Sequence, residues 1–541
     1  MAPIGKLRAA VLRMNKKVTV QYAAALLAGS TLLSILLGLQ RDRLLNSMYL
    51  GTYKVGLDAY TAAFTVPDFM FMILVSGALS VTFIPVFNQR AAAGNKKSAW
   101  QLSSSMINLM ALVTLITSVL IIIFADPIVR YLVAPGLSES GTALAVSMMR
   151  VIAVNPFLFA IAAVIASIQQ AVGRFAFYAL APALYNVGII IGTLFFTNGI
   201  TIFGWELFDG GIMGVALGVV FGSVLQLVVS LIGLAGLGFD YQFKIFWKNH
   251  GFRKVLNLLP ARSLDQGMDY VVTLVEYNLA SRMTEGSVRA LNQASTLHLA
   301  PINMIGVSIS TAAYPRMTEY LAQNRTDLFC KEFAQVLRAI IWLALPVSVV
   351  TFFARGYLIH FIVNGGDPAI ARVLGAFALA ILFRSIYHMA ARGFYARKDT
   401  KTPLYVSIFA IGLNIALAIW FTFGWRLGAS GLALAQVIVS GLEVAILLSL
   451  MAVQVPGSLT RHTAHAVGRM LIAAAITAVV AYTATALFPL TADDKSFFTS
   501  IPKFGIIAGV SLSAYLVLSK MLRLPEADPV IAKLRHFFFR V

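Results

Sequence analysis

The amino-acid sequence predicts an all-α polytopic membrane protein with about 14 transmembrane helices. The chain is 59% hydrophobic and only 12% charged over its 541 residues, and its mean hydropathy is +0.82. These values exclude a disordered chain and lie far from those of a soluble domain. The basic residues lie between apolar runs of about 20 residues, which is the length that crosses a bilayer. The composition and the apolar runs together indicate a protein with many transmembrane helices.

The apolar runs define the expected helices in chain order. We expect them at roughly 20–40, 56–88, 100–124, 142–168, 174–197, 210–237, 255–281, 288–315, 333–354, 368–391, 403–423, 428–453, 465–488 and 501–522.

The charge distribution predicts the orientation of these helices. The formal net charge of +20 suggests nucleic acid at first sight, but basic residues between apolar runs are typical of loops that face anionic lipid headgroups. An even number of spans puts both termini on one side. That side carries roughly 28 Lys and Arg residues against roughly 12 on the other, which predicts that it is cytoplasmic.

Both ends of the chain have a membrane interpretation. The run YAAALLAGSTLLSILLGL follows a basic segment, but it is longer than a signal-peptide core and no small-x-small cleavage site follows it. We expect it to be a retained first helix. The tail PVIAKLRHFFFRV is basic and amphipathic, which predicts a helix on the cytoplasmic membrane surface.

Two pairs of segments indicate an internal repeat. The second and eighth helices both end in a proline, Pro85 and Pro315, followed by a polar exit. The turns QQAVGRFAFYALAP and ARGFYARKDTKTP are both basic and aromatic and lead to a proline. Each pair is six helices apart, which suggests that helices 1–6 and 7–12 are related bundles, an arrangement typical of transporters.

The segment PARSLDQGMDYVVTLVEYN, residues 260–278, places charges inside a membrane-length helix. At about 100° per residue, Asp265, Asp269 and Glu276 fall within about 40° of one another, and Arg262 lies one turn before Asp265. One interpretation is a hydrated face that binds a cation or a proton. The alternative is that Pro260 and Gly267 break the helix and the acids pair with bases on neighbouring helices.

Other polar residues also lie at membrane depth, where a charge costs about 2.5–3.5 kcal/mol on insertion scales. They are Arg41, Asp58, Asp68 and Arg384, which shares a helix face with His388. We expect Asn186 and Asn414 to form hydrogen bonds between helices.

No catalytic motif is present, so we do not expect an enzyme. The sequence has no phosphate-cradling Walker loop and no zinc-type His/Glu motif. Its one cysteine, Cys330, excludes an intrachain disulfide.

Several stretches resemble a known family. They are SILLGLQRD (34–42), DAYTAAFTVPDF (58–69), GALSVTFIPVF (77–87), APGL (134–137), GRFAFYALAPALYN (173–186) and, as the most specific, GFYARKDTKTP (393–403). These stretches resemble the MurJ/MviN lipid II flippases of the multidrug/oligosaccharidyl-lipid/polysaccharide exporter superfamily.

The resemblance implies two six-helix lobes in a V shape and two C-terminal helices that form a lipid groove. The implied domains are 1–240, 241–455, 456–525 and the cytoplasmic tail 526–541. It also implies an undecaprenyl-diphosphate-linked glycopeptide as substrate, held by a cationic cavity, and a position in the cytoplasmic membrane of a bacterium. We expect membrane lipids as further partners, no nucleic acid and a monomer.

Several family positions differ in this chain. Of four arginines that the resemblance places in the cavity, Arg41 is present, whereas three positions hold Ile35, Phe71 and Thr296. The family's asparagine in the second helix is Asp68, and Asp58 matches a family aspartate. The expected substrate residues are therefore Arg41, Asp42, Asp58, Asp68, Arg384 and His298.

The replaced arginines leave three functions open. The first is a lipid II flippase, the second a flippase for another polyprenyl-diphosphate-linked oligosaccharide, and the third a cation-coupled exporter of a small solute. We expect no cofactor beyond a coupling sodium ion or proton. The coupling residues would be Arg262, Asp265, Asp269, Glu276 and Asn414; sodium in relatives lies between helices 7 and 11, which suggests Asp265, Asp269 and Asn414 here.

Overall fold

The computed structural model describes residue 15 and residues 20–539, apart from 77–78, 203–204, 492–493 and 495–496. The chain divides into two compact units, an N-terminal unit of Met1–Val288 and a C-terminal unit of Arg289–Val541. Each unit is a bundle of long helices.

The described part of the N-terminal unit contains the helices α2 to α10 and their connections. In chain order its elements are α2 (Val20–Tyr49), α3 (Lys54–Phe71), η1 (Met72–Ser76), α4 (Leu79–Ala92), α5 (Lys96–Pro127), η2 (Ile128–Val133), α6 (Glu139–Ile152), α7 (Asn155–Ala171), α8 (Ala176–Phe195), η3 (Phe196–Asn198), β1 (Ile200–Ile202), β2 (Trp205–Phe208), α9 (Met213–Ile232) and α10 (His250–Ser281).

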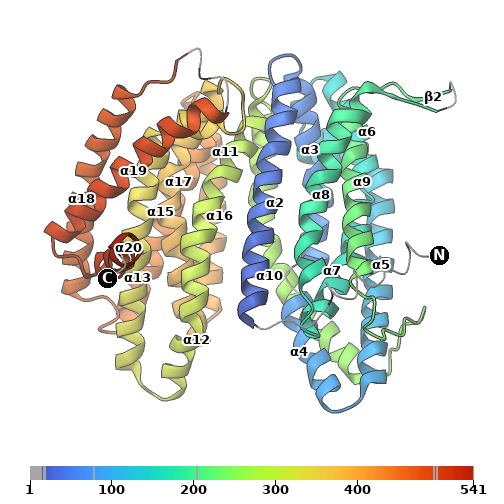
Figure 1. The fold of residues 1–541 in the computed structure, drawn as a ribbon, viewed down its shortest axis with the longest axis horizontal. Coiled ribbons are helices and arrows are strands. Elements are labelled where there is room, and N and C mark those ends of the chain that lie inside the picture. Colours follow the sequence, from blue (N-terminus) through green and yellow to red (C-terminus); the bar gives the residue numbers. More distant parts are fainter. Residues whose placement is uncertain are drawn as a thin grey trace. The chain divides into compact units, whose positions relative to one another are not determined.

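The C-terminal unit begins at Arg289, within the first turn of α11. Its elements are α11 (Ser287–Ile302), η4 (Asn303–Val307), α12 (Ser308–Ala322), α13 (Thr326–Phe353), α14 (Arg355–His360), α15 (Pro368–Ala396), α16 (Lys401–Ile419), η5 (Trp420–Gly424), α17 (Ala429–Gln454), α18 (Arg461–Leu487), α19 (Phe497–Met521), η6 (Pro525–Ala527) and α20 (Asp528–Phe539). Figure 1 shows α18 to α20 as the red segments of this unit.

The predicted spans are helical in the structure. Each of the roughly fourteen apolar segments falls on a helix or a pair of consecutive helices. In the described residues, eleven helical segments are long and apolar enough to cross a membrane. The apolar surface agrees with this: in α5, Ile116 is 52% and Ile123 60% exposed, as expected for side chains that face lipid. The chain is therefore a helical membrane protein with many spans.

Two details of the fold differ from expectation. A short antiparallel hairpin, β1–β2, lies between α8 and α9, and the sequence analysis did not predict it. In addition, α10 continues as one helix from His250 to Ser281. Pro260 and Gly267 therefore do not break this helix, and that part of the alternative interpretation is wrong.

Wide helical turns mark two of the proline-containing helices. The π-helical segment η1 follows α3, which contains Pro67, and η4 follows α11, which ends near Pro301. Such turns leave backbone groups that need new partners. At η4 the backbone approaches α15 closely, because a Cβ added to Gly306 would lie 2.6 Å from the Cα of Ser385.

The helices α8 and α9 form the closest helix pair of the N-terminal unit. A Cβ added to Gly188 would lie 2.2 Å from the Cα of Gly222, and one added to Gly192 would lie 2.2 Å from the Cα of Gly218. The glycines recur every four residues on both helices, so a continuous stripe without side chains lets the backbones meet. This contact fixes α8, which carries Asn186.

The C-terminal helices pack on α13. The indole nitrogen of Trp342 donates to the hydroxyl of Ser519 over 3.0 Å, and Arg338 forms a largely buried ion pair with Glu526 at 3.0 Å. The amphipathic tail that the sequence predicted corresponds to α20.

The two compact units divide at Val288, and this division reflects which helices pack together. The helix α10 packs with α3, α4 and α5, whereas the boundary predicted at residues 240 and 241 concerns a sequence repeat. The repeat and the domain division stay predictions.

Candidate functional site

A polar cluster centred on Arg41 lies where α2 packs against α8. The Nε and Nη2 groups of Arg41 donate to Oδ1 of Asp42 over 3.3 and 3.1 Å, and Nη1 donates to Oδ1 of Asn186 over 3.1 Å. The Arg41 side chain remains 25% exposed and that of Asp42 10%. The cluster therefore holds an arginine in a fixed orientation without covering it.

The same cluster brings together two of the stretches quoted above. The side-chain nitrogen of Asn186 donates to the carbonyl of Ser34 over 3.2 Å. Gly38 faces the same amide, since an added Cβ would lie 3.8 Å from its oxygen. Residues 34–42 and 173–186 thus meet in space, although about 145 residues separate Arg41 from Asn186. The prediction that Asn186 forms an interhelical hydrogen bond is confirmed.

Asp68 extends the cluster to α3. Its half-buried side chain interacts electrostatically with Arg41 and with Tyr185 of α8. Three helices therefore contribute charged or polar groups to one place, and the structure brings the candidate residues Arg41, Asp42 and Asp68 together there.

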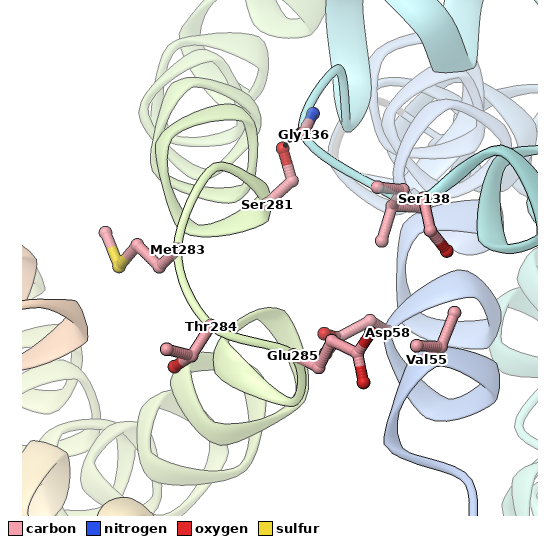
Figure 2. A pocket seen from close by; sticks show the side chains of 9 residues that line it. Val55, Asp58, Gly136, Ser138, Ser281, Met283, Thr284 and Glu285 are labelled. Carbon is pink, nitrogen blue, oxygen red and sulfur yellow. Dashed lines mark hydrogen bonds between the residues drawn. The ribbon is translucent and has the colours of Figure 1, made fainter.

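Asp58 lies elsewhere. It is ten residues from Asp68 in α3, or about 15 Å along the helix, and it lines a separate pocket of about 250 Å³. Figure 2 shows this pocket between the start of α3, the 134–138 loop and the α10–α11 connection. The backbone N–H of Gly286 donates to Oδ2 of Asp58 over 2.6 Å.

The APGL stretch forms another wall of this pocket. The N–H of Gly136 donates to the hydroxyl of Ser281 over 3.2 Å. A Cβ added to Gly136 would lie 2.3 Å from the carbonyl oxygen of Ser281, so only glycine fits here. At this pocket Asp58 holds the α10–α11 connection in place through the Gly286 N–H.

The C-terminal unit contains a second polar cluster, formed by Arg384 and two histidines. His298 of α11 is 1% exposed and stacks on Phe377 of α15, with ring centroids 4.3 Å apart and planes 4° apart. Arg384 interacts electrostatically with His298 and with His388 and lies 5.8 Å from the ring centre of Tyr387. The structure thus brings the predicted residues His298 and Arg384 together within this unit.

The proposed coupling residues are only partly described. Glu276 is buried, with 8% exposure, and Asn414 is buried in α16. The side chains of Arg262, Asp265 and Asp269 lie outside the described residues. Among the side chains that are described, no group of three His, Cys, Asp or Glu residues could hold a metal ion. The sodium site and the role of these residues stay predictions.

The three positions without arginine have different surroundings. Ile35 is 53% exposed, and the hydroxyl of Thr296, on an exposed position, donates to its own helix at Asn292. Phe71 packs edge-on against Phe159, with centroids 5.4 Å apart. Phe71 therefore makes an apolar contact at a position where the family resemblance implies an arginine.

Two buried ionic residues were not among the predicted site residues. Arg289 is 3% exposed at the start of α11, and Glu443 is 5% exposed in the middle of α17. Glu443 accepts a hydrogen bond of 2.8 Å from Ser407. The signal was available, because Glu443 is a lone acid in the apolar run SGLEVAILL.

The helical fold, the apolar exterior and the ionic clusters at membrane depth define a multi-span membrane transporter. The chain belongs to the lipid II flippase MurJ family, since the family profile described as "Lipid II flippase MurJ" matches residues 47–501. The family that the sequence resembled is thereby confirmed.

Similar proteins cover most of the chain. A "Probable lipid II flippase MurJ" of Bdellovibrio bacteriovorus is 26% identical over 80% of this chain and 82% of its own length, and one of Thermotoga maritima is 27% identical over 75% and 80%. A solved "Lipid II flippase MurJ, inward closed conformation" has a TM-score of 0.73 at 25% identity, over 92% of this chain and 98% of its own.

A multidrug transporter shares the fold. An inward-facing MATE family transporter of the MOP superfamily has a TM-score of 0.65 at 15% identity, over 79% of this chain and 95% of its own. At that identity the likeness concerns the fold alone.

Proposed function

We propose that this protein moves lipid II from the inner to the outer leaflet of the cytoplasmic membrane by alternating access. Membership in the flippase family supports the substrate, and the Arg41 cluster is the observation that carries the proposal for this chain. The lipid carries a diphosphate, which is an anion that arginine binds through paired N–H groups.

The hydrogen bonds of Arg41 support a role in headgroup binding. An arginine has five N–H donors, and three are used by Asp42 and Asn186. Two donors remain, one on each terminal nitrogen, and the side chain is a quarter exposed. Asp42 and Asn186 act as positioning residues that fix the guanidinium, whereas Asp68 lowers the net charge that the headgroup meets.

Replacement of Arg41 tests this proposal. We expect Arg41→Ala, and also Arg41→Lys because an ammonium cannot reproduce the fork of donors, to lose complementation of a bacterial strain depleted of its own flippase. The matched control is Arg130→Ala, since Arg130 pairs with Asp126 and Glu139 at an exposed position. Full complementation by Arg41→Ala at wild-type membrane levels would rule out the proposed role.

A second substrate is favoured by the replaced arginines. With Ile35, Phe71 and Thr296 at three cavity positions of the family, this chain carries fewer basic groups for a headgroup than the resemblance implies. A flippase for another polyprenyl-diphosphate-linked oligosaccharide fits such a change. Proteoliposomes with fluorescent lipid II or with a carrier-matched lipid-linked oligosaccharide separate the two substrates by the rate at which each lipid reaches the outer leaflet.

The coupling ion and the orientation complete the proposal. Sodium or a proton at Asp265, Asp269, Glu276 and Asn414, with Arg262 beside them, would reset the carrier. Sodium-dependent flipping that Asp269→Asn abolishes would favour sodium. Both termini would face the cytoplasm, because the loops on that side carry the excess of Lys and Arg.

A further inference from the structure

A buried carboxylate in the C-terminal unit has no role in the function proposed above. Glu443 lies in the middle of α17, is 5% exposed, and belongs to a segment with a hydropathy of 2.1 that is apolar enough to cross a membrane. An ionisable group at such a depth is costly and usually serves an ion or proton pathway.

Glu443 ends a hydrogen-bonded chain across three helices. The hydroxyl of Ser407 in α16 donates to Oε1 of Glu443 over 2.8 Å, and the hydroxyl of Tyr387 in α15 lies 3.1 Å from that of Ser407. A serine hydroxyl has one proton, so when Ser407 donates to Glu443 the proton between the two hydroxyls comes from Tyr387. The chain then runs from Tyr387 through Ser407 to Glu443.

The Tyr387 end of this chain is half-buried, whereas Glu443 is buried. Tyr387, Arg384 and His388 are half-buried in α15, and the Arg384 guanidinium lies 5.8 Å from the Tyr387 ring centre. The helices α15 and α16 both pack on α17 (Figure 1). The hydroxyls therefore connect a buried acid to a half-buried face that carries the Arg384 guanidinium.

We propose that Glu443 is a proton-binding site and that Tyr387 and Ser407 form its proton path. In the binding step hydronium gives up one proton and becomes water, each hydroxyl passes one proton on and receives one, and the carboxylate becomes a carboxylic acid. No other bond changes. A positive charge on Arg384 favours the ionised acid, so movement of Arg384 away from the chain favours proton uptake.

Titratable side chains lie on two of the three elements that pack against α17, and on α15 they include His388 and Arg392 beside Arg384. On α15, Tyr387 interacts electrostatically with Glu443, Arg384 and Tyr395. On α16, Lys401 and Tyr405 are exposed, and Tyr405 lies two positions from Ser407, on the opposite side of the helix. The segment η5, WFTFG, carries no titratable side chain.

Proton binding would couple the carrier to a proton gradient, and this coupling rests on the proposed flippase function. An anionic headgroup that draws Arg384 away from Tyr387 would promote proton uptake at Glu443. The proton site itself is measurable without any lipid substrate, so its failure and that of the flippase proposal are distinguishable.

Infrared spectroscopy of the purified full-length protein in detergent tests the site. Between about pH 4 and 10, we expect the difference between the wild-type and Glu443→Gln spectra to gain the carbonyl band of a protonated carboxylic acid as the pH falls, because the bands of all other carboxyl groups are common to both proteins and cancel. Glu319→Gln is the matched control, because Glu319 lies at an exposed position of α12, and its spectrum should retain the band. Identical wild-type and Glu443→Gln spectra over the whole range would overturn the proposal.

Two further variants keep the carboxylate in place. One hydroxyl of the chain is removed in each of Ser407→Ala and Tyr387→Phe. We expect Ser407→Ala to raise the midpoint pH of the Glu443 band by about one unit, because the ionised carboxylate loses a hydrogen bond. Tyr387→Phe should slow proton uptake after a rapid pH jump. An unchanged midpoint in Ser407→Ala together with unchanged uptake in Tyr387→Phe would overturn the path even if Glu443→Gln fails to fold.

Discussion

Arg41 is held by its own protein neighbours, but its guanidinium is not saturated. Asp42 compensates the charge at 3.1 Å, and Asn186 fixes the third donor from another helix. Burial of an unpaired charge would be strongly unfavourable, whereas this arrangement keeps an arginine at membrane depth with two donors for an anion. Arg41 and Asp68 could be identified from the sequence, because charged residues at membrane depth usually have a functional role. The sequence could not identify Asn186 as the hydrogen-bond partner of Arg41.

Asp58 has a structural consequence that is separate from the Arg41 cluster. We expect Asp58→Ala to destabilise the α10–α11 connection by about 1–3 kcal/mol, because the Gly286 N–H loses its acceptor. Hydrogen exchange of residues 282–287 in detergent measures the loss. Glu285→Ala, at an exposed position of the same pocket, should change it by less than about 0.5 kcal/mol; equal loss in both variants would contradict a specific role of Asp58.

The helices differ in what determines their packing. The α8–α9 pair depends on glycines, since its backbones are too close for any Cβ, whereas α13 and its neighbours meet through large side chains such as Phe333 and Trp342. A glycine stripe tolerates no substitution at its centre, but a side-chain interface can adjust.

Gly192→Leu tests the α8–α9 contact. We expect a loss of about 3 kcal/mol or more, because the new side chain has no space beside Gly218. Thermal unfolding in detergent measures it. Gly412→Leu is the matched control in α16, where an added Cβ meets nothing within 4 Å; similar unfolding temperatures for the two variants would be the contrary result.

The stability of the start of α16 depends on pH through Asp399, which belongs to the GFYARKDTKTP stretch. Its carboxylate accepts from the Thr402 hydroxyl over 2.6 Å and from the N–H groups of Thr402 and Lys401 over 3.0 and 3.1 Å. These donors, foremost the hydroxyl, hold the pKa of Asp399 below its usual value. The stabilisation is therefore complete above the unfolded-state pKa of about 3.9.

As the pH falls through the lowered pKa of Asp399, that stabilisation disappears. We expect wild-type unfolding temperatures to fall more steeply than those of Asp399→Asn below about pH 4. Parallel curves for the two proteins would show that the capping contacts contribute nothing.

The whole molecule consists of two compact units with an apolar exterior. Its orientation in the membrane is predicted from the basic residues of the loops. Cys330 is the only cysteine of the sequence, so Cys330→Ser gives a background for single cysteines. The charge distribution predicts that the loop after α12 lies in the cytoplasm and that the loop before α6 lies on the other side.

Labelling of intact spheroplasts with a membrane-impermeant maleimide tests that orientation. We expect Ser140→Cys to react and Gln323→Cys to react only after the membrane is permeabilised; both positions are exposed. The reverse pattern would mean that the termini lie outside.

Sequence alone determined the membrane class, the helix positions and the family, because hydrocarbon imposes apolar runs of fixed length and penalises every charge within them. The tertiary structure decided which polar groups meet. It joined Ser34, Arg41 and Asn186, separated Asp58 from Asp68, and linked Tyr387 to Glu443. Hydropathy is a property of one segment, whereas a hydrogen bond between helices depends on the rotation and spacing of both, and packing such as the α8–α9 glycine contact fixes these only in the folded chain.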